Sequence, residues 1–263
     1  KTPRLSKSGV EYLDYSWGVW SGCRNLQAGI CSVKACWAKG IALHYPKLYP
    51  YGFEPHYYHE AIESPMQLKK PSRISVGWVG DIIGYCDSSS VARESIIRTI
   101  QKCPQHTFLF LTKNPEKLHQ WSPFPDNCWV GVSVTNQLML SDALLRLIGV
   151  DAKVKFLSFE PLLGEINVSF NGVGEIGFPN GELQWVIIGS QTKPTVFPKI
   201  EWVSEIVQAC DKAKIPVFLK GNLEPLWTLE NSREPFFKFH RPSPGATEIG
   251  KLRQEMPDVK AIH

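Results

Sequence analysis

Apolar residues occur along this chain in short unbroken runs, separated by longer segments in which they recur every three or four positions. The runs are rich in β-branched and aromatic residues and are apolar at nearly every position, which is typical of strands buried on both faces. They lie at residues 73–79, 106–112, 128–134, 154–159, 184–189 and 215–219. Helical periodicity follows at residues 91–102, 136–148 and 200–213. This alternation predicts βα units and a mainly parallel sheet.

Six such strands, with a seventh expected at residues 15–20, are about what a full or partial (β/α) TIM-type barrel of parallel strands requires. An open doubly wound sheet fits the same alternation, because single-sequence patterns predict the fold class better than the topology. The length suits one barrel domain over residues 1–263. Two stretches interrupt the pattern: an aromatic loop at 44–60 and an irregular, proline-containing C-terminal segment at 222–263.

Three cysteines occur close together, at Cys23, Cys31 and Cys36, with seven residues in the first gap and four in the second. Thiolates are soft ligands that suit iron–sulfur clusters and zinc. Three thiolates leave one iron of a four-iron cluster without a protein ligand, and a substrate or cofactor can bind there. The loop follows the first strand, at 15–20, and precedes a helix expected at 36–44. In a barrel this position is the mouth, where active sites are built.

Other interpretations of the same thiols stay open. A structural zinc site completed by His44 or by a distant ligand is one, and a zinc-dependent barrel hydrolase that uses His44 or His56 is another. A non-enzymatic binding module stabilised by the metal is a third. The remaining cysteines stand in or beside apolar segments and are expected to be buried spectators; they are Cys86, Cys103, Cys128 and Cys210.

Four sequence blocks in order carry a resemblance to a known family. They are Trp20-Ser21-Gly22-Cys23 with Cys36-Trp37-Ala38, residues 106–116 (HTFLFLTKNPE), residues 131–137 (GVSVTNQ) and residues 158–164 (SFEPLLG). Here the chain resembles the radical S-adenosylmethionine (SAM) superfamily, and within it a phage- and prokaryote-associated three-cysteine family of largely uncharacterised proteins. The second cysteine gap holds four residues where that family's pattern has two, so the loop conformation is left to the structure.

The resemblance implies a [4Fe–4S] cluster on the three cysteines, with SAM bound at the open iron. It further implies reductive cleavage of SAM to a 5′-deoxyadenosyl radical and a reductant such as flavodoxin or ferredoxin as partner. SAM carries an ammonium group, a carboxylate and a ribose, and polar residues at the expected strand ends suit these groups. The candidate cofactor-binding residues are Gly80, Asp81, Lys113, Ser133, Asn136 and Glu160.

Several of these candidates also have a structural interpretation. Asp81 suits the cap of a turn, and Lys113 suits an ion pair with Glu160. Ser133 and Asn136 suit the start of the next helix. The aromatic loop 44–60 either stacks on a base beside the cluster or folds over the barrel mouth with a small core of its own. The second interpretation is favoured, because no run of Lys or Arg accompanies the rings.

Charge and composition narrow the class of protein. A net charge of +4 weakly favours an anionic partner, so together with family analogy it makes a nucleic acid or nucleotide the expected substrate class. Seven cysteines, an odd number, argue against a disulfide framework. The basic N-terminus lacks a secretory signal and no apolar run is long enough to cross a membrane, so a cytoplasmic protein without a membrane partner is expected.

Overall fold

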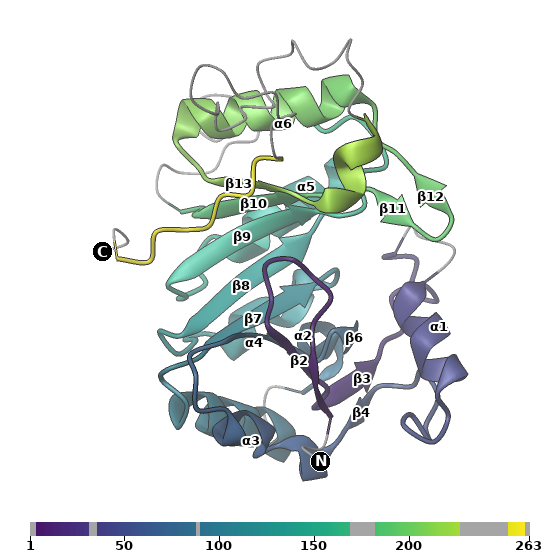
Figure 1. Cartoon of the computed structure of the whole chain (residues 1–263), viewed down its shortest axis with the longest axis vertical. Coiled ribbons are helices and arrows are strands. Elements are labelled where there is room, and N and C mark those ends of the chain that lie inside the picture. Colours follow the sequence, from purple (N-terminus) through teal and green to yellow (C-terminus); the bar gives the residue numbers. More distant parts are fainter. Residues whose placement is uncertain (1–3, 32–35, 88–89, 169–181, 227–251, 261–263) are drawn as a thin grey trace, which may run out of the picture. The chain divides into compact units, whose positions relative to one another are not determined.

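The computed structural model describes residues 4–31, 36–87, 90–168, 182–226 and 252–260 (Figure 1). The chain divides into two compact units, one of residues 1–132 and 145–155 and the other of residues 133–144 and 156–263. Both units are α/β with mainly parallel strands, so the predicted fold class is confirmed at that level. The assignment of residues 1–263 to one barrel domain stays a prediction. No helix in the described ranges is long and apolar enough to cross a membrane.

The first unit is built on a run of paired strands in the order β1-β2-β5-β7-β8. Strand β1 (Leu5–Lys7) pairs antiparallel with β2, and the other neighbours are parallel. The parallel strands are β2 (Tyr15–Trp17), β5 (Arg73–Val76), β7 (Thr107–Thr112) and β8 (Cys128–Ser133). Rings from neighbouring strands and from a helix fill the core, with Trp17 and Phe108 centroids 5.8 Å apart and Phe110 and Trp121 centroids 5.6 Å apart. This core gives the strand ends a fixed frame.

A small second sheet in this unit has the order β4-β3-β6 and carries the thiol loop. Its strands are β3 (Trp20–Gly22), β4 (His56–Tyr57) and β6 (Val79–Gly80). The helices of the unit are α1 (Trp37–His44), α2 (Ile82–Tyr85), α3 (Val91–Gln101) and α4 (Leu118–Trp121). Single 3-10 turns cover His59–Ala61, Ser64–Gln67 and Pro115–Lys117. Helix α1 packs against β3 and β6, which seats it beside the thiol loop (Figure 1).

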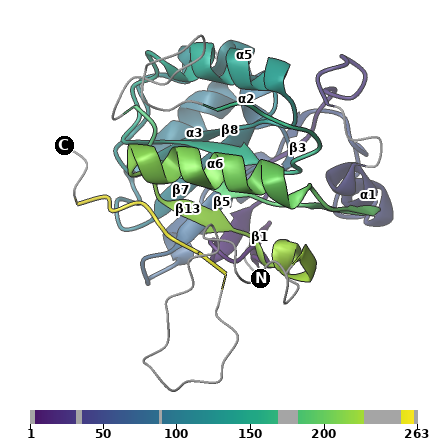
Figure 2. The same cartoon turned by 90° about the horizontal axis from the view of Figure 1, so that it is seen from above.

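The second unit has three parallel strands in the order β9-β10-β13. They are β9 (Val154–Phe159), β10 (Trp185–Ile188) and β13 (Val217–Leu219). Helix α6 (Ile200–Ala213) lies along β13 in both views and buries Val203, Ile206, Val207 and Cys210 (Figures 1 and 2). Helix α5 (Gln137–Leu147), the hairpin β11 (Gln191–Thr192) with β12 (Thr195–Val196), and a 3-10 turn at Gly221–Leu226 complete the described elements.

The predicted strands and helices are confirmed, with two corrections. Residues 73–79 form two strands instead of one, because Gly77 takes a left-handed backbone conformation (φ 66°) between β5 and β6. Residues 15–20 likewise divide into β2 and β3. The sequence had suggested that the thiol loop follows the first strand of the parallel sheet. In the structure the loop follows β3 of the small sheet instead. Neither run of paired strands closes on itself within its own described residues.

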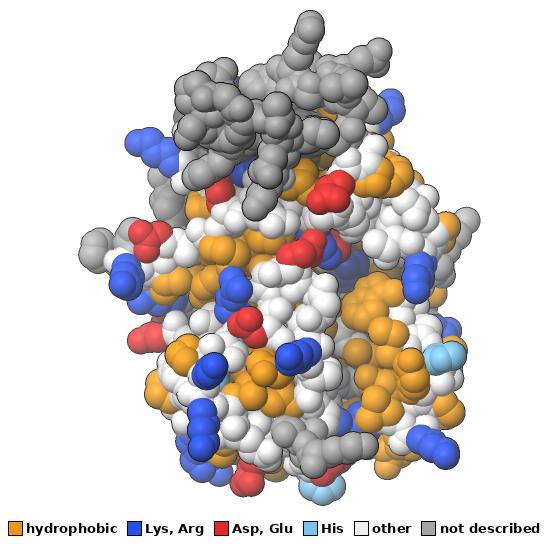
Figure 3. Space-filling model, in the orientation of Figure 1, with side chains coloured by type: hydrophobic (Ala, Val, Ile, Leu, Met, Phe, Trp, Pro, Cys, Tyr) orange, Lys and Arg blue, Asp and Glu red, His pale blue; other side chains and the backbone are white. Residues whose placement is uncertain are grey.

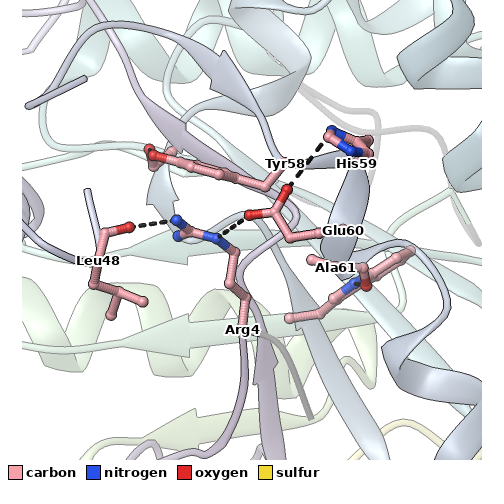
Figure 4. Close-up of polar contacts among 8 residues, drawn as sticks. Arg4, Leu48, Tyr58, His59, Glu60 and Ala61 are labelled. Carbon is pink, nitrogen blue, oxygen red and sulfur yellow. Dashed lines mark hydrogen bonds and ion pairs between the residues drawn. The ribbon is translucent and has the colours of Figure 1, made fainter. Parts of the chain in front are cut away.

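A buried arginine anchors the aromatic loop 44–60 to the N-terminal strand region (Figure 4). Arg4 donates from Nε to Glu60 Oε1 at 3.1 Å and from its other guanidinium end to the carbonyl oxygen of Leu48. Its guanidinium lies over the Tyr58 ring, 3.3 Å from the centroid. The side chain is only 9% exposed. The loop thus has the small core of its own that the sequence favoured, with Tyr49 and Tyr58 inside it.

Arg4→Ala is expected to lower the free energy of unfolding by about 2–3 kcal/mol, because it removes two charge-assisted hydrogen bonds and a cation–π contact at once. The matched control is Arg24→Ala. Arg24 also forms an ion pair, with Glu54 at 2.8 Å, but both side chains are about 60% exposed, so the expected loss is under about 0.5 kcal/mol. Urea denaturation of both variants measures the difference. Equal losses would contradict the anchoring role.

Candidate metal centre

The three clustered thiols come from one loop of the first unit, between β3 and α1. Cys23 directly follows β3, and Cys36 is the N-cap of α1, where its Sγ accepts from the backbone N–H of Lys39 at 3.5 Å. All three are partly exposed and none forms a disulfide. Residues 32–35 of the loop lie outside the described residues. Cys23 therefore lies at a strand end and Cys36 at a helix start, and the packing of α1 on β3 holds these two places together.

Burial and neighbouring groups act on the pKa of Cys23. Burial raises the pKa of Cys23 to about 11, and repulsion from Asp81, Cys36 and Cys31 adds to the rise. A backbone hydrogen bond from Asn25 to the Cys23 sulfur acts in the opposite direction. Cysteines bind metals as thiolates, so the positive charge of bound iron would lower the pKa of Cys23 and offset this repulsion.

The donor set of this loop is three partly exposed thiols, and thiolates suit both an iron–sulfur cluster and zinc. Among the described residues, which leave out 32–35 of this loop, no three His, Cys, Asp or Glu side chains form a group that could hold one metal ion. His44 and His56, the further ligands of the zinc alternatives, contact the rings of Tyr45 and Tyr51. The identity of the metal centre stays a prediction.

Asn25 organises the thiol loop, and sequence reasoning missed it. Its backbone carbonyl oxygen accepts hydrogen bonds from the backbone N–H groups of Ile30 and Cys31, at 2.9 and 3.0 Å. Its side chain donates to Asp81 Oδ2 at 2.8 Å and accepts from the Tyr85 hydroxyl at 2.9 Å. With its N–H directed at the Cys23 sulfur, this buried residue ties two of the thiols to α2. An Asn in a loop is ordinary, so only its burial reveals the role.

Asp81 is a buried hydrogen-bond acceptor, 3% exposed, that links the thiol loop to β7. Besides Asn25, it accepts from the Thr112 hydroxyl at 2.7 Å, the Lys113 backbone N–H at 2.9 Å and the Gly84 N–H at 3.1 Å. The last of these bonds makes it the N-cap of α2. A carboxylate has about four acceptor positions, and here four donors occupy them. The capping interpretation is confirmed, and a contact of Asp81 with SAM stays a prediction.

Asp81→Asn is expected to lower the free energy of unfolding by about 2–3 kcal/mol, because the new amide N–H group faces donors instead of accepting from them. Asp87→Asn is the control, since the Asp87 side chain is 78% exposed and pairs only at the surface with Lys117. Its expected change is within about 0.5 kcal/mol. Thermal or urea unfolding gives both values. An Asp81→Asn protein as stable as the parent that fails to bind SAM would instead support direct contact.

Two glycines allow the strands beside the thiols to approach closely. Gly22 and Gly80 are register partners in the parallel β3–β6 pair. A Cβ on Gly80 would lie 2.5 Å from the Gly22 nitrogen, and one on Gly22 would lie 2.2 Å from the Glu54 oxygen. Gly80 is therefore in close contact with the backbone that leads into Cys23. A role of Gly80 in cofactor binding stays a prediction.

Polar groups also gather at the strand ends of the second unit. Glu160 follows β9 and forms an ion pair with Lys220, which follows β13. Ser190, after β10, exchanges hydrogen bonds with Asn222 at 2.9 to 3.1 Å. Glu160 thus has Lys220 as an ion-pair partner. These side chains are partly buried, and their hydrogen bonds fix a polar cluster at the carboxyl ends of these strands. A pair between Glu160 and Lys113 stays a prediction.

The remaining candidates lie around the end of β8. Ser133 is its last residue and is buried. The Asn136 side chain accepts a hydrogen bond from the Met139 N–H at 3.0 Å, which makes Asn136 the N-cap of α5. The helix-start interpretation is confirmed for Asn136, and contact of either residue with a ribose stays a prediction. Cys86, Cys103, Cys128 and Cys210 are buried, as expected.

Residues 7–241 match a family described as "Protein of unknown function (DUF5131)". The chain belongs to this family. The match includes the thiol loop, Asp81 and the strand ends of both units. Neither a curated protein nor a solved structure matches the chain. Membership in DUF5131 therefore leaves the chemistry to the residues themselves.

Proposed function

We propose that this DUF5131 protein is a radical SAM enzyme that holds a [4Fe–4S] cluster through Cys23, Cys31 and Cys36. The observation that carries the proposal is the position of these thiols: they share one loop between β3 and α1, and all three are partly exposed. The four other cysteines are buried in the cores of the units. The loop thus supplies three thiolates, which leaves one iron for SAM.

When bound and reduced, such a cluster would supply the electron for the cleavage of SAM into methionine and a 5′-deoxyadenosyl radical. The chain itself has to bind the cluster and SAM, orient them, and shield the radical from solvent. Asn25 orients Cys23 and Cys31 through its backbone, and Asp81 holds Asn25 in place. Cys36 lies at the N-terminus of α1, whose positive dipole end favours negative charge. Gly22 lets the backbone reach this position beside β6.

The proposal extends to the fold and to the cofactor contacts. We place the parallel strands in a full or partial (β/α) barrel with the thiol loop at its mouth. Lys113, Ser133, Asn136 and Glu160 are then the candidates for the carboxylate, ribose and ammonium of SAM. Gly80 and Asp81, beside the thiol loop, complete the set of candidates for SAM contacts. Seven unpaired cysteines suit the reducing cytoplasm, where flavodoxin or ferredoxin would supply the electron.

Anaerobic purification and reconstitution test the cluster first. The protein is expected to be brown and to yield about four iron and about four sulfide per chain. Colourless protein that binds one zinc would overturn the proposal in favour of the zinc alternatives. With the cluster in place, SAM and dithionite are expected to yield 5′-deoxyadenosine, detected by mass spectrometry. A stable cluster that gives none under these conditions would point to a binding or redox module.

A further inference from the structure

The surface beside the thiol loop exposes an unusual number of aromatic rings. Trp37, the first residue of α1, is 51% exposed, and Tyr45 and Tyr51 beyond its end are 54% and 56% exposed. In the described ranges only one other Trp, Tyr or Phe, Phe197, is comparably exposed. Figure 3 shows hydrophobic side chains gathered over α1 and the segment that follows it. We call residues 37–51 the aromatic face.

The aromatic face lacks a run of Lys or Arg, but it also lacks acidic residues and so has a net positive charge. Residues 15–53 contain no Asp or Glu, although at the chain's average of 25 acidic residues in 263 a run this long would hold about four. Lys39 and Lys47 are exposed on the face itself. Glu54, the first acid after the run, is paired with Arg24. The face therefore presents rings and positive charge without a competing carboxylate from its own segment.

The backbone under these rings is held in place. The N–H groups of Leu48 and Tyr49 donate to the Tyr45 carbonyl, both at 2.9 Å, and the Gly52 N–H donates to the Tyr49 carbonyl at 3.0 Å. Tyr49 itself is buried, with the Arg4 guanidinium 5.5 Å from its ring centroid. Tyr51 stacks on His56 with centroids 3.7 Å apart. The buried ring of Tyr49 thus anchors the segment, while Trp37, Tyr45 and Tyr51 stay more than half exposed.

We propose that the aromatic face binds single-stranded nucleic acid and presents a base or sugar to the thiol loop. Unpaired bases stack on exposed aromatic rings, and the phosphates favour a surface that has Lys and lacks Asp and Glu. A duplex hides its base faces, so it offers the rings little. The proposal deepens the radical SAM proposal by naming the substrate class, and it rests on that proposal for the reaction but not for the binding.

Continuity with the thiols supports this assignment. Trp37 is the neighbour of Cys36, and Arg24 is the neighbour of Cys23. The Arg24–Glu54 pair joins the thiol loop to the end of the aromatic segment. A strand stacked on Trp37 therefore runs beside the loop that holds the cluster. An acidic redox protein would also favour the lysines, but it has no need of three exposed rings.

Fluorescence anisotropy with labelled single-stranded DNA and RNA of mixed sequence, without SAM or reductant, tests the proposal. Trp37→Ala and Tyr45→Ala are each expected to weaken binding roughly 5- to 150-fold. Phe197→Ala, at the exposed ring outside the face, is the matched control and is expected to leave affinity unchanged. Duplex DNA of the same length is expected to bind far more weakly. Comparison of the affinities for single-stranded DNA and RNA shows which nucleic acid the face prefers.

Three outcomes would overturn the inference: no binding of either single strand, equal losses in Phe197→Ala, or a loss in Lys39→Glu with none in the ring variants. Weaker reduction of the cluster by flavodoxin in the ring variants, with unchanged nucleic-acid binding, would assign the face to the reductant instead and overturn it too. Binding that behaves as expected in a protein that never acquires a cluster would sink the radical SAM proposal and leave this inference standing.

Discussion

Cys31→Ala is expected to remove the iron–sulfur cluster, reducing iron from about four per chain to a small fraction of that after anaerobic reconstitution. The loop has three clustered thiols and the other cysteines are buried, so the described structure offers no exposed thiol to replace Cys31. Cys31 is partly exposed. Its loss should therefore leave the metal-free protein folded, and iron content measures ligation and not stability.

Cys210→Ala is the matched control for this substitution. It also removes one thiol, but from the buried face of α6. Iron and sulfide content are expected to match the parent protein, with at most a modest decrease in stability from the lost core sulfur. Equal iron content in the two variants would contradict the assignment of Cys31 as a ligand. Circular dichroism of both metal-free proteins confirms that each variant is folded.

Gly22→Ala is expected to lower the free energy of unfolding by about 3–5 kcal/mol. Gly22 has φ 83°, where an L side chain is strained, and its Cβ would lie 2.2 Å from the Glu54 carbonyl oxygen and 2.6 Å from that of Phe53. Both contacts are with backbone, which cannot rotate away as a flexible side chain would. Because Cys23 is the next residue, iron content should fall as well.

Gly29→Ala separates conformational strain from steric clash. Gly29 lies in the same loop with φ 71°, but nothing lies within 4 Å of its Cβ position. Only the positive φ is then penalised, for an expected loss of about 1–2 kcal/mol. Urea denaturation of the two metal-free variants gives the comparison. Similar losses in both would show that the close approach of the Glu54 backbone to Gly22 is not what the loop depends on.

Much of the fold follows from the apolar pattern. Strand β9 and helix α6 begin and end where that pattern predicts, because all six residues of β9 are buried and α6 has one continuous apolar face. The pattern fails at Gly77. There, apolar residues continue through 73–79, but the backbone turns and packs against Trp20, whose Cβ would be 2.9 Å from a Cβ on Gly77. Hydrophobic periodicity does not register such a turn.

The candidate site divides in the same way. The three clustered cysteines are visible in the sequence because their spacing alone is unusual for a reduced protein of this size. Asn25 and Arg4 have no such signal, since their partners lie far along the chain: Asp81 for the first, Leu48 and Glu60 for the second. The sequence could name the rings of the aromatic loop but not which of them face outward.

By itself, the sequence determined the α/β class, most strand and helix positions, and the thiols of the candidate cluster, because each depends on residues close together along the chain. Only the tertiary structure decided that the thiol loop follows β3, that four donors surround Asp81, and that Glu160 pairs with Lys220. It also decided that Tyr49 is buried while Tyr45 is exposed. Each of these outcomes depends on burial and on hydrogen bonds between distant segments, which exist only once the chain has packed.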